Sequence, residues 1–392
     1  MTTDTEVAPI SEPRMSKRGQ LSRRAILAAA IGASASRFVP SHSFAQEARP
    51  LPPVDVTFLF AADIHACRMA TGLSPNCQEE GKTDENLLRH IAALNGITRY
   101  QWPTKIAGRA TELAGAGMPI ATPAGLVIGG DMTDDGGGQV TMPSEGTQLL
   151  QFSHRYQQGV GEDRVHFPVY VGLGNHDLDQ DGPAPHSDWY RRELRDYVEI
   201  NHRPGLFFKP PVPADNYDPE SDCFSWDWGG LHLVQLHRFG GDKSKGAVDS
   251  LTWLKQDLAT SAGDGRPIVL FQHYGWDPFS TEDWDPERST FDEEGSGPPH
   301  WWSEADRRAL LAAIDGYNVI GVFHGHQHET PMIYRGDGLD LLKPKAAFMG
   351  GFAVARITAD FFDVVLAEAS DEMGLVFTHA FSKVVRAGGI GQ

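Results

Sequence analysis

The stretch 54-VDVTFLFAADIH-65 joins a run of strand-forming residues directly to an aspartate and a histidine. Residues 54–60 are mostly apolar and β-branched, which predicts a buried β-strand. Asp63 and His65 follow two positions apart, so that both side chains can point the same way from an extended turn. The stretch therefore predicts a strand that ends at a polar site containing a carboxylate and an imidazole.

Four later stretches repeat this arrangement of an apolar strand followed by polar residues. The predicted strands are residues 126–130, 165–171, 268–271 and 319–323. Behind them come side chains with oxygen or nitrogen donors: Asp131, Asn175, His176, Asp177, His273, His326 and His328. Ligands gather at the carboxyl ends of strands in open α/β sheets, so we expect these side chains to meet. Glycines at positions 130, 174 and 325 allow sharp backbone turns beside them.

The donor types of these residues indicate a site for two metal ions. Carboxylate and amide oxygens and imidazole nitrogens suit Zn, Fe, Mn and similar divalent ions. No cysteine is among the residues, which argues against a structural zinc site. Two such ions about 3.5–4 Å apart can clamp a phosphoryl group and generate a hydroxide. The pattern therefore favours metal-assisted hydrolysis of a phosphate ester.

Taken in order, the motifs D-x-H, G-D, G-N-H-D, H and G-H-x-H resemble those of the calcineurin-like metallophosphoesterase superfamily over about residues 54–330. The resemblance implies that two divalent ions, Fe, Mn or Zn, are bound by seven residues. The ligands of one ion would be Asp63, His65 and His328. Those of the other would be Asn175, His273 and His326, with Asp131 between the two ions.

The resemblance also implies catalytic roles for two residues that are not metal ligands. His176 would protonate the leaving oxygen as a general acid, and Asp177 would orient its ring. The predicted enzyme is a di-metal hydrolase that cleaves a phosphate ester, preferentially a phosphodiester, by attack of metal-activated hydroxide. A phosphomonoesterase acting on a small substrate is the first alternative. A di-metal amidase or peptidase and a non-catalytic metal-binding protein are disfavoured by the intact Asn175-His176-Asp177 set.

Other polar residues near these motifs are expected to be structural. Isolated histidines such as His232 are usually surface residues or core residues with satisfied hydrogen bonds. His324 alternates away from His326 on an extended segment and is expected to lie behind the ligands or in the core. Asp134 stands in an aspartate-rich turn of a kind that is common without a metal.

The rest of the chain predicts the layers around these strands. Leucine and isoleucine share one helical face over residues 87–94, and leucines do so over 251–258. Ser303 begins a third predicted helix with a capping box, and alternating apolar segments from residue 345 onward predict antiparallel strands. The periodicity indicates an α/β protein. The resemblance adds the second sheet, so we expect a four-layer α/β/β/α sandwich of two mixed sheets flanked by helices, the metallophosphoesterase fold.

The first 45 residues predict a signal peptide of the twin-arginine type. Arg23 and Arg24 precede a short apolar stretch, and Ser43-Phe44-Ala45 offers the small residues that a signal peptidase reads. The motif departs from its commonest form at two positions, so Sec-type export stays open. An apolar stretch of about twelve residues is too short to span a bilayer, so no stable membrane anchor is expected after cleavage. We expect residues 46–392 to form a metallophosphoesterase domain that is periplasmic or secreted, delivered by the twin-arginine export machinery.

The charge of the chain bears on its partners. It holds 34 Lys and Arg against 52 Asp and Glu, a formal net charge of −18. The first 45 residues contain six of the basic and three of the acidic residues, which leaves 28 basic and 49 acidic residues from Gln46 onward. Nucleic acid and anionic membranes both attract basic surfaces, so neither is expected as a partner.

Substrate specificity is expected to lie in a long segment between the fourth and fifth motifs. Residues 274–302 are rich in Trp, Phe and carboxylates, and we treat them as a lid insertion or as an acidic surface loop. Aromatic faces beside carboxylates suit a cationic group, so a small-molecule or lipid-headgroup phosphate ester is the expected substrate. Trp276 and Trp284 are the candidate contacts from this segment, and His237 could reach the same cleft.

The three cysteines are expected to include one disulfide. Cys67 and Cys77 flank a short loop directly after the first motif, where a bond between them would brace the rim of the site. Two free thiols are the alternative. Cys223 is the odd cysteine and is expected to be buried.

Overall fold

Strand β1 (Asp55–Ala61), the strand of the first motif, lies inside the first of two large sheets in the computed structural model of the protein. The structure describes residues 53–69, 72–73, 75–134, 147–178, 186–244, 246–277, 284–285, 290–291, 301–371 and 374–385. These residues belong to one compact unit that begins at Ala48. The predicted signal peptide lies outside the described residues.

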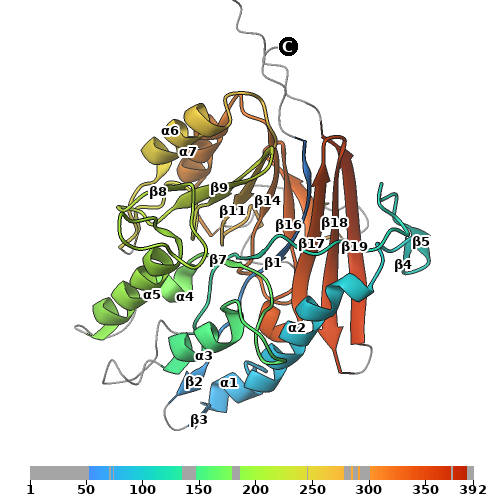
Figure 1. The fold of residues 1–392 in the computed structure, drawn as a ribbon, viewed down its shortest axis with the longest axis horizontal. Coiled ribbons are helices and arrows are strands. Elements are labelled where there is room, and N and C mark those ends of the chain that lie inside the picture. Colours follow the sequence, from blue (N-terminus) through green and yellow to red (C-terminus); the bar gives the residue numbers. More distant parts are fainter. Residues whose placement is uncertain are drawn as a thin grey trace, which may run out of the picture. The chain divides into compact units, whose positions relative to one another are not determined.

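The first sheet has six strands and contains three of the five predicted motif strands (Figure 1). Its order is β19 (Gly374–Val384), β18 (Phe361–Ser370), β17 (Gly351–Thr358), β1, β6 (Leu126–Ile128) and β7 (Val169–Val171). Strands β1, β6 and β7 are parallel, whereas β17, β18 and β19 pair antiparallel, as the alternation after residue 345 predicted. The parallel part brings three motifs to one edge of the sheet.

The second sheet has seven strands and contains the other two motif strands. Its order is β15 (Met332–Gly336), β16 (Leu339–Lys343), β14 (Val319–Phe323), β11 (Ile268–Phe271), β10 (Leu231–Gln235), β9 (Phe224–Trp228) and β8 (Asn216–Tyr217). Strands β10, β11, β14 and β16 are parallel. Three small hairpins lie apart from the large sheets: β2–β3 (Arg68–Met69, Gly72–Leu73), β4–β5 (Lys105–Ile106, Arg109–Ala110) and β12–β13 (Trp284–Asp285, Thr290–Phe291).

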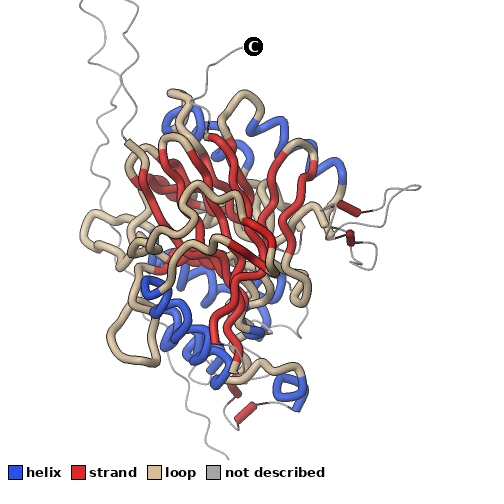
Figure 2. The backbone as a smooth tube through the Cα atoms, turned by 90° about the vertical axis from the view of Figure 1, so that its right-hand side faces the viewer, coloured by secondary structure: helices blue, strands red, loops and turns tan. Residues whose placement is uncertain are grey.

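The two sheets pack face to face through aromatic side chains. Phe58 of β1 lies with its ring centroid 5.8 Å from that of Phe271 of β11 and 5.5 Å from that of Phe323 of β14. Phe60, two residues along β1, contacts Phe323 at 5.2 Å, as the two-residue repeat of a strand requires. In Figure 2 strands fill the middle of the described part and helices border them above and below.

Helices cover the outer face of each sheet. Helices α6 (Leu251–Ser261) and α7 (Glu304–Ile314) pack with Val234, Leu270 and Val322 of the second sheet in one apolar cluster. Helix α2 (Asp84–Gly96) buries Leu87, Ile91 and Leu94 in the other cluster, with the first sheet. The remaining helical segments are α1 (Pro75–Glu79), η1 (Ile97–Arg99), α3 (Thr147–Tyr156), α4 (Asn175–Leu178), α5 (His186–His202) and η3 (Ala347–Met349).

The expected four-layer α/β/β/α sandwich is therefore confirmed, as are the three predicted helices. Ser303 caps α7 as expected, because its hydroxyl oxygen accepts a hydrogen bond from the backbone N–H of Asp306 at 3.2 Å. Two strands are shorter than predicted: β6 ends at Ile128, and β7 begins at Val169, after Pro168, which has no N–H to donate to a sheet. Among the described helices, none combines the length and apolar character needed to cross a membrane.

A buried ion pair links β10 to α6. The ring of His232 lies between two carboxylates, with Nδ1 2.7 Å from Asp227 and Nε2 2.9 Å from Asp257. Burial alone would lower the pKa of His232, but these two carboxylates outweigh it and raise the pKa to about 9. His232 is thus a core histidine with satisfied hydrogen bonds, as expected.

We predict that the pKa shift of His232 makes stability depend on pH. Because the folded pKa of about 9 lies above the ordinary value of 6.5, the stabilisation is complete below pH 6.5 and is lost as pH rises through 9. Its size is at most about 3 kcal/mol. Chemical denaturation of wild type and His232→Gln at pH 6 and pH 9.5 should show the difference in free energy of unfolding shrinking at the higher pH. A difference that stays constant would contradict the charged pair.

Candidate metal centre

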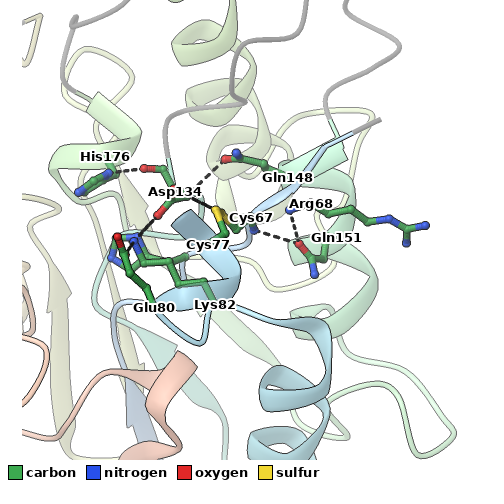
Figure 3. Close-up of a disulfide and its surroundings, with 10 residues drawn as sticks. Cys67, Arg68, Cys77, Glu80, Lys82, Asp134, Gln148, Gln151 and His176 are labelled. Carbon is green, nitrogen blue, oxygen red and sulfur yellow. Dashed lines mark hydrogen bonds and ion pairs between the residues drawn. A yellow bond between two sulfur atoms is a disulfide. The ribbon is translucent and has the colours of Figure 1, made fainter. Parts of the chain in front are cut away.

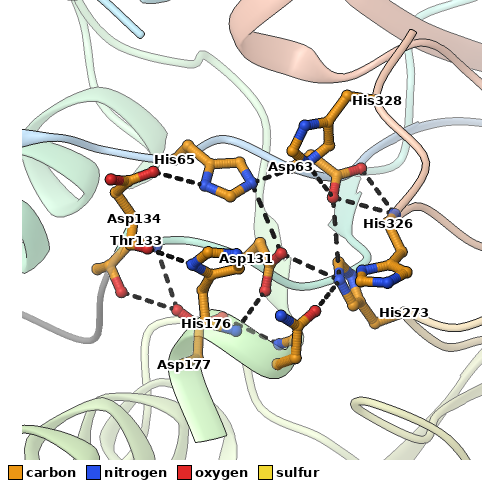
Figure 4. Close-up of polar contacts among 12 residues, drawn as sticks. Asp63, His65, Asp131, Thr133, Asp134, His176, Asp177, His273, His326 and His328 are labelled. Atoms are coloured by element: carbon orange, nitrogen blue, oxygen red, sulfur yellow. Dashed lines mark hydrogen bonds and ion pairs between the residues drawn. The ribbon is translucent and has the colours of Figure 1, made fainter. Parts of the chain in front are cut away.

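The predicted ligands converge at the carboxyl ends of the motif strands (Figure 4). Asp63 and His65 follow β1, Asp131 follows β6, and Asn175 begins α4 after β7. From the second sheet, His273 follows β11, and His326 and His328 follow β14. The face-to-face packing of the sheets brings the two sets of strand ends together, so one site forms from residues that are up to 265 positions apart.

One group of donors consists of Asp63, His65, Asp131 and His328, whose ligand atoms all lie within 4.8 Å of one another. His65 Nε2 is 3.1 Å from His328 Nε2 and 3.6 Å from Asp131 Oδ2. His328 Nε2 is 3.7 Å from Asp63 Oδ1. Four donors around one point match the coordination needs of a divalent ion.

A second group consists of Asp131, His273 and His326, again within 4.8 Å of one another. His273 Nε2 lies 3.0 Å from Asp131 Oδ2 and 3.0 Å from the amide oxygen of Asn175. Asp131 belongs to both groups, which is the position expected of a bridging carboxylate. Its environment among three histidines lowers the pKa of Asp131 well below the ordinary value, although burial opposes the shift.

The imidazoles are oriented as metal-binding histidines are. His65 Nδ1 lies 3.0 Å from the Asp134 carboxylate and His273 Nδ1 lies 3.0 Å from the carbonyl oxygen of Gly129. An N–H donated from Nδ1 leaves the lone pair of Nε2 directed at the centre. His326 Nε2 is buried and has no hydrogen-bond partner. Burial lowers the pKa of His326 well below its ordinary value and that of His328 to about 4, which keeps both rings neutral. These residues fit two divalent ions.

The backbone at the site is strained. Four predicted ligands that are not glycine have positive φ: Asp63 at 57°, His65 at 47°, Asp131 at 52° and His326 at 76°. Such conformations cost about 1–3 kcal/mol each and cluster at functional sites. Glycines permit the close packing of these loops, since a Cβ on Gly174 would lie 2.1 Å from Asp131 Oδ1. Gly325 is limited in the same way by Asp63.

His176 lies beside the first group, but Asp177 does not orient it. The Nδ1–H of His176 donates to the backbone carbonyl of Asp134. The carboxylate of Asp177 instead accepts hydrogen bonds from the backbone N–H groups of Met132, Thr133 and Gly174 at 3.0–3.1 Å, and from the Thr133 hydroxyl at 3.0 Å. The expected role of Asp177 is therefore corrected: it fixes the loops that carry Asp131 and Asn175.

The carboxylate that supports a site histidine belongs to Asp134, which the sequence did not single out. Besides His65, its Oδ1 binds the buried Lys82 ammonium at 2.6 Å (Figure 3). Beside it the structure joins Cys67 to Cys77, with their Cα atoms 6.2 Å apart, whereas Cys223 is free and buried. Asp134 thus links the disulfide loop to a metal ligand. Its aspartate-rich turn was the only signal, and the partner Lys82 is 52 residues away in sequence.

A second buried cation supports the loop of the last motif. Lys343 is fully buried, and its ammonium donates to the carbonyl oxygens of Gln327 and Thr330. Gln327 stands between the ligands His326 and His328, so Lys343 fixes the loop that positions both. His324 lies behind this loop as expected, with Nε2 3.0 Å from the hydroxyl of Tyr334.

Two of the three predicted substrate contacts are core residues. His237 is buried, accepts a hydrogen bond from the Leu173 N–H through Nδ1 at 3.1 Å, and has its pKa lowered to about 4 by burial. Trp276 is buried against Trp302, and its indole N–H donates to Asp337 at 2.8 Å. Both predictions are corrected, because these rings pack inside the fold. The side chain of Trp284 and most of the expected lid, residues 278–300, lie outside the described residues except for the backbone of β12 and β13.

The residues that do extend the site from this segment are Tyr274 and Trp301. Their rings lie 4.5 Å and 4.0 Å from that of His326, measured between centroids. Trp301 was among the aromatic residues of the segment, but nothing in the sequence distinguished it from Trp276 and Trp284. Its position depends on the fold of both ends of the insertion.

Comparison with known proteins identifies the family of the chain. The family model of calcineurin-like phosphoesterases matches residues 56–330. Comparison with curated protein sequences gives no match. Among solved structures, a dimetal phosphatase from Danio rerio is similar over 85% of this chain and 100% of its own, with 12% identity and a TM-score of 0.45.

Two further solved structures are similar over about half of their own length. A purple acid phosphatase from yellow lupin seeds (Lupinus luteus) covers 84% of this chain and 53% of its own, with 12% identity and a TM-score of 0.47. A putative 5'-nucleotidase from Staphylococcus aureus covers 86% and 56%, with 14% identity and a TM-score of 0.40. The family match over most of the chain and the two donor groups show that the chain belongs to the calcineurin-like phosphoesterase family and is a phosphoesterase with a site for two metal ions.

Proposed function

We propose that the protein is an exported phosphodiesterase that cleaves a small-molecule or lipid-headgroup phosphate ester. The observation that carries this proposal is the pair of donor groups that share Asp131, with His176 beside them. Asp63, His65 and His328 would hold one ion, and Asn175, His273 and His326 the other. When bound, two divalent ions polarise phosphoryl oxygens and lower the pKa of a water molecule.

His176 is proposed as the general acid. Its Nδ1–H is held by the Asp134 carbonyl, so in the protonated ring the other N–H, on Nε2, is available to the leaving oxygen. The carboxylate of Asp131 and the carbonyl of Asp134 raise the pKa of His176 above its ordinary value, although burial opposes them. The ring is partly exposed beside His65, at a centroid distance of 4.7 Å, and can therefore meet a substrate.

The charges around the site favour a phosphodiester over a phosphomonoester. A phosphodiester carries one negative charge, whereas a phosphomonoester carries up to two. Binding of the second negative charge requires cationic side chains close to the metal ions. Lys82 is occupied by Asp134 and Glu80, and Lys343 by two carbonyl oxygens. These two lysines are therefore committed to holding loops.

The first prediction tests the metal centre and the reaction together. After reconstitution with Fe, Mn or Zn, the purified protein should hold about two ions and hydrolyse bis-(p-nitrophenyl) phosphate faster than p-nitrophenyl phosphate. Asp131→Asn should lose both ions and several orders of magnitude in activity, because one carboxylate serves both groups. Elemental analysis and the two assays measure these outcomes.

Two controls make this result specific. His326→Ala should mainly empty one position. Asp55→Asn changes an exposed aspartate that begins β1, at the end opposite to Asp63, and pairs with Arg356, so this variant should retain both ions and full activity. Faster hydrolysis of the monoester would support the alternative phosphomonoesterase. Cleavage of a chromogenic peptide but of neither phosphate would support a di-metal amidase and contradict the proposal.

The second prediction separates the acid from the ligands. His176→Ala should keep its metal ions and lose about 10²–10⁴ in rate on esters with alkoxide leaving groups. The loss should be much smaller for p-nitrophenol, which leaves without a proton. His166→Ala, which removes an exposed histidine, is the control. Equal losses for both leaving groups would remove His176 from this role.

We further propose that residues 1–45 direct twin-arginine export, which would place residues 46–392 in the periplasm or outside the cell. Replacing Arg23 and Arg24 by lysine should leave precursor in the cytoplasm, measured by fractionation and immunoblotting. In the exported protein a non-reduced peptide map should show Cys67 joined to Cys77, the pair that the structure joins. Undiminished export of the double variant would indicate the Sec route.

A further inference from the structure

A cavity of about 450 Å³ opens beside the metal centre and plays no part in holding the ions. Its walls come from three separate segments: residues 238–244, Tyr274, and residues 301–306. This volume lies within the range of about 300–1,000 Å³ that is typical of small-molecule sites. The cavity can therefore accept a group of substantial size next to the reacting phosphorus.

Aromatic rings connect the cavity to the metal ligands. Trp301 stands edge to face against His326 at 4.0 Å, and Tyr274 lies 4.5 Å from the same ring. Further in, Phe239 stacks on Tyr274 at 5.9 Å and contacts Trp302 at 4.7 Å. A group bound on these rings would adjoin the position of the ion held by His326.

Of the charged side chains that line the cavity, Arg238 and Asp242 pair with each other. The Arg238 guanidinium binds Asp242 at 2.6 Å and the carbonyl and hydroxyl oxygens of Ser244 at 2.8 Å. At the rim, Asp306 accepts a hydrogen bond from the Ser303 hydroxyl at 2.6 Å. Lys243 pairs with Asp249 at 3.0 Å. Two cations and two carboxylates balance within the lining, so the described walls offer aromatic faces without a net charge.

We propose that this cavity is the subsite for one of the two alcohol groups of the phosphodiester and that it selects an alcohol carrying a flat, uncharged aromatic ring. Aromatic pairs are worth about 0.5–1.5 kcal/mol beyond their burial, whereas a lining with two cations and two carboxylates provides no net attraction for a cationic headgroup. The proposal rests on the proposed phosphodiesterase function and replaces the cationic headgroup expected from the composition of residues 274–302. The ring can come from a simple aryl alcohol or from a nucleoside.

The proposal is tested by ligand binding, which does not depend on turnover. Isothermal titration of the metal-loaded protein should show benzylphosphonate binding about tenfold or more tighter than methylphosphonate, which corresponds to about 1.4 kcal/mol. Trp301→Leu should lose most of that preference and leave methylphosphonate binding unchanged, while Trp301→Phe should restore most of it. Trp253→Leu, in α6 and outside the lining, is the matched control and should bind like wild type.

Trp301 contacts a metal ligand, so a second variant is needed in case its replacement also disturbs the ions. Phe239→Leu removes a lining ring that contacts Tyr274 and Trp302, and it should lower the preference for benzylphosphonate with metal content unchanged. Titration with adenosine then distinguishes a nucleoside from a simple aryl alcohol as the source of the aromatic ring. Binding that depends on Trp301 indicates a nucleoside, and binding of the benzyl group alone indicates a simple aryl alcohol.

Two results would overturn the subsite. Either equal affinity of wild type for the two phosphonates, or equal weakening of both in Trp301→Leu and Phe239→Leu, means that the rings are structural. Failure of the proposed function looks different. In that case the metal-loaded wild type hydrolyses no phosphodiester, irrespective of its affinity for the benzyl group.

Discussion

The rest of the structure depends on the contacts that the Asp131 carboxylate makes with histidines of both sheets. One of its oxygens lies 3.0 Å from His273 and 3.6 Å from His65, and these two histidines come from different sheets. Asp131 can contact both histidines because Phe58 and Phe60 hold β1 against β11 and β14. This packing brings the carboxyl ends of the parallel strands of both sheets together. The packing of the sheet interface therefore sets the spacing of the donors.

Placing so many donors close together costs free energy. Interactions made by residues that are not predicted ligands offset this cost. Four predicted ligands adopt left-handed backbone conformations, and the neutral imidazole of His326 is buried with no hydrogen-bond partner at Nε2. Three tethers offset this cost. Asp177 binds backbone N–H groups of two ligand loops, Asp134 connects His65 to Lys82, and Lys343 binds carbonyl oxygens around the last motif. These tethers hold the polar groups of the site in place, as electrostatic preorganisation for catalysis requires.

The sequence was sufficient for features that are local and insufficient for features that depend on distant partners. Each motif follows its strand directly, so strand patterns and donor types together predicted the convergence of the donors, whereas the shared position of Asp131 was implied by the family resemblance. The roles of Asp134 and Asp177 could not be predicted, since Asp134 follows β6, Asp177 lies in α4 after β7, and each contacts residues that are distant in sequence. Likewise, nothing in the sequence around Trp276, His237 and Trp301 indicated that the first two are buried.

The metal-binding donors and the walls of the cavity lie in different parts of the fold. The predicted ion-binding donors lie at the ends of β1, β6, β7, β11 and β14, and all of these strands except the edge strand β7 have hydrogen-bonded neighbours on both sides. The walls of the aromatic cavity lie on connections between strand and helix, where insertions do not disturb either sheet. His326 is where the two parts meet, because it belongs to a strand end and yet contacts Trp301 and Tyr274. A change in those two aromatic residues can therefore alter which alcohol is accepted while the sheets continue to hold the ions in place.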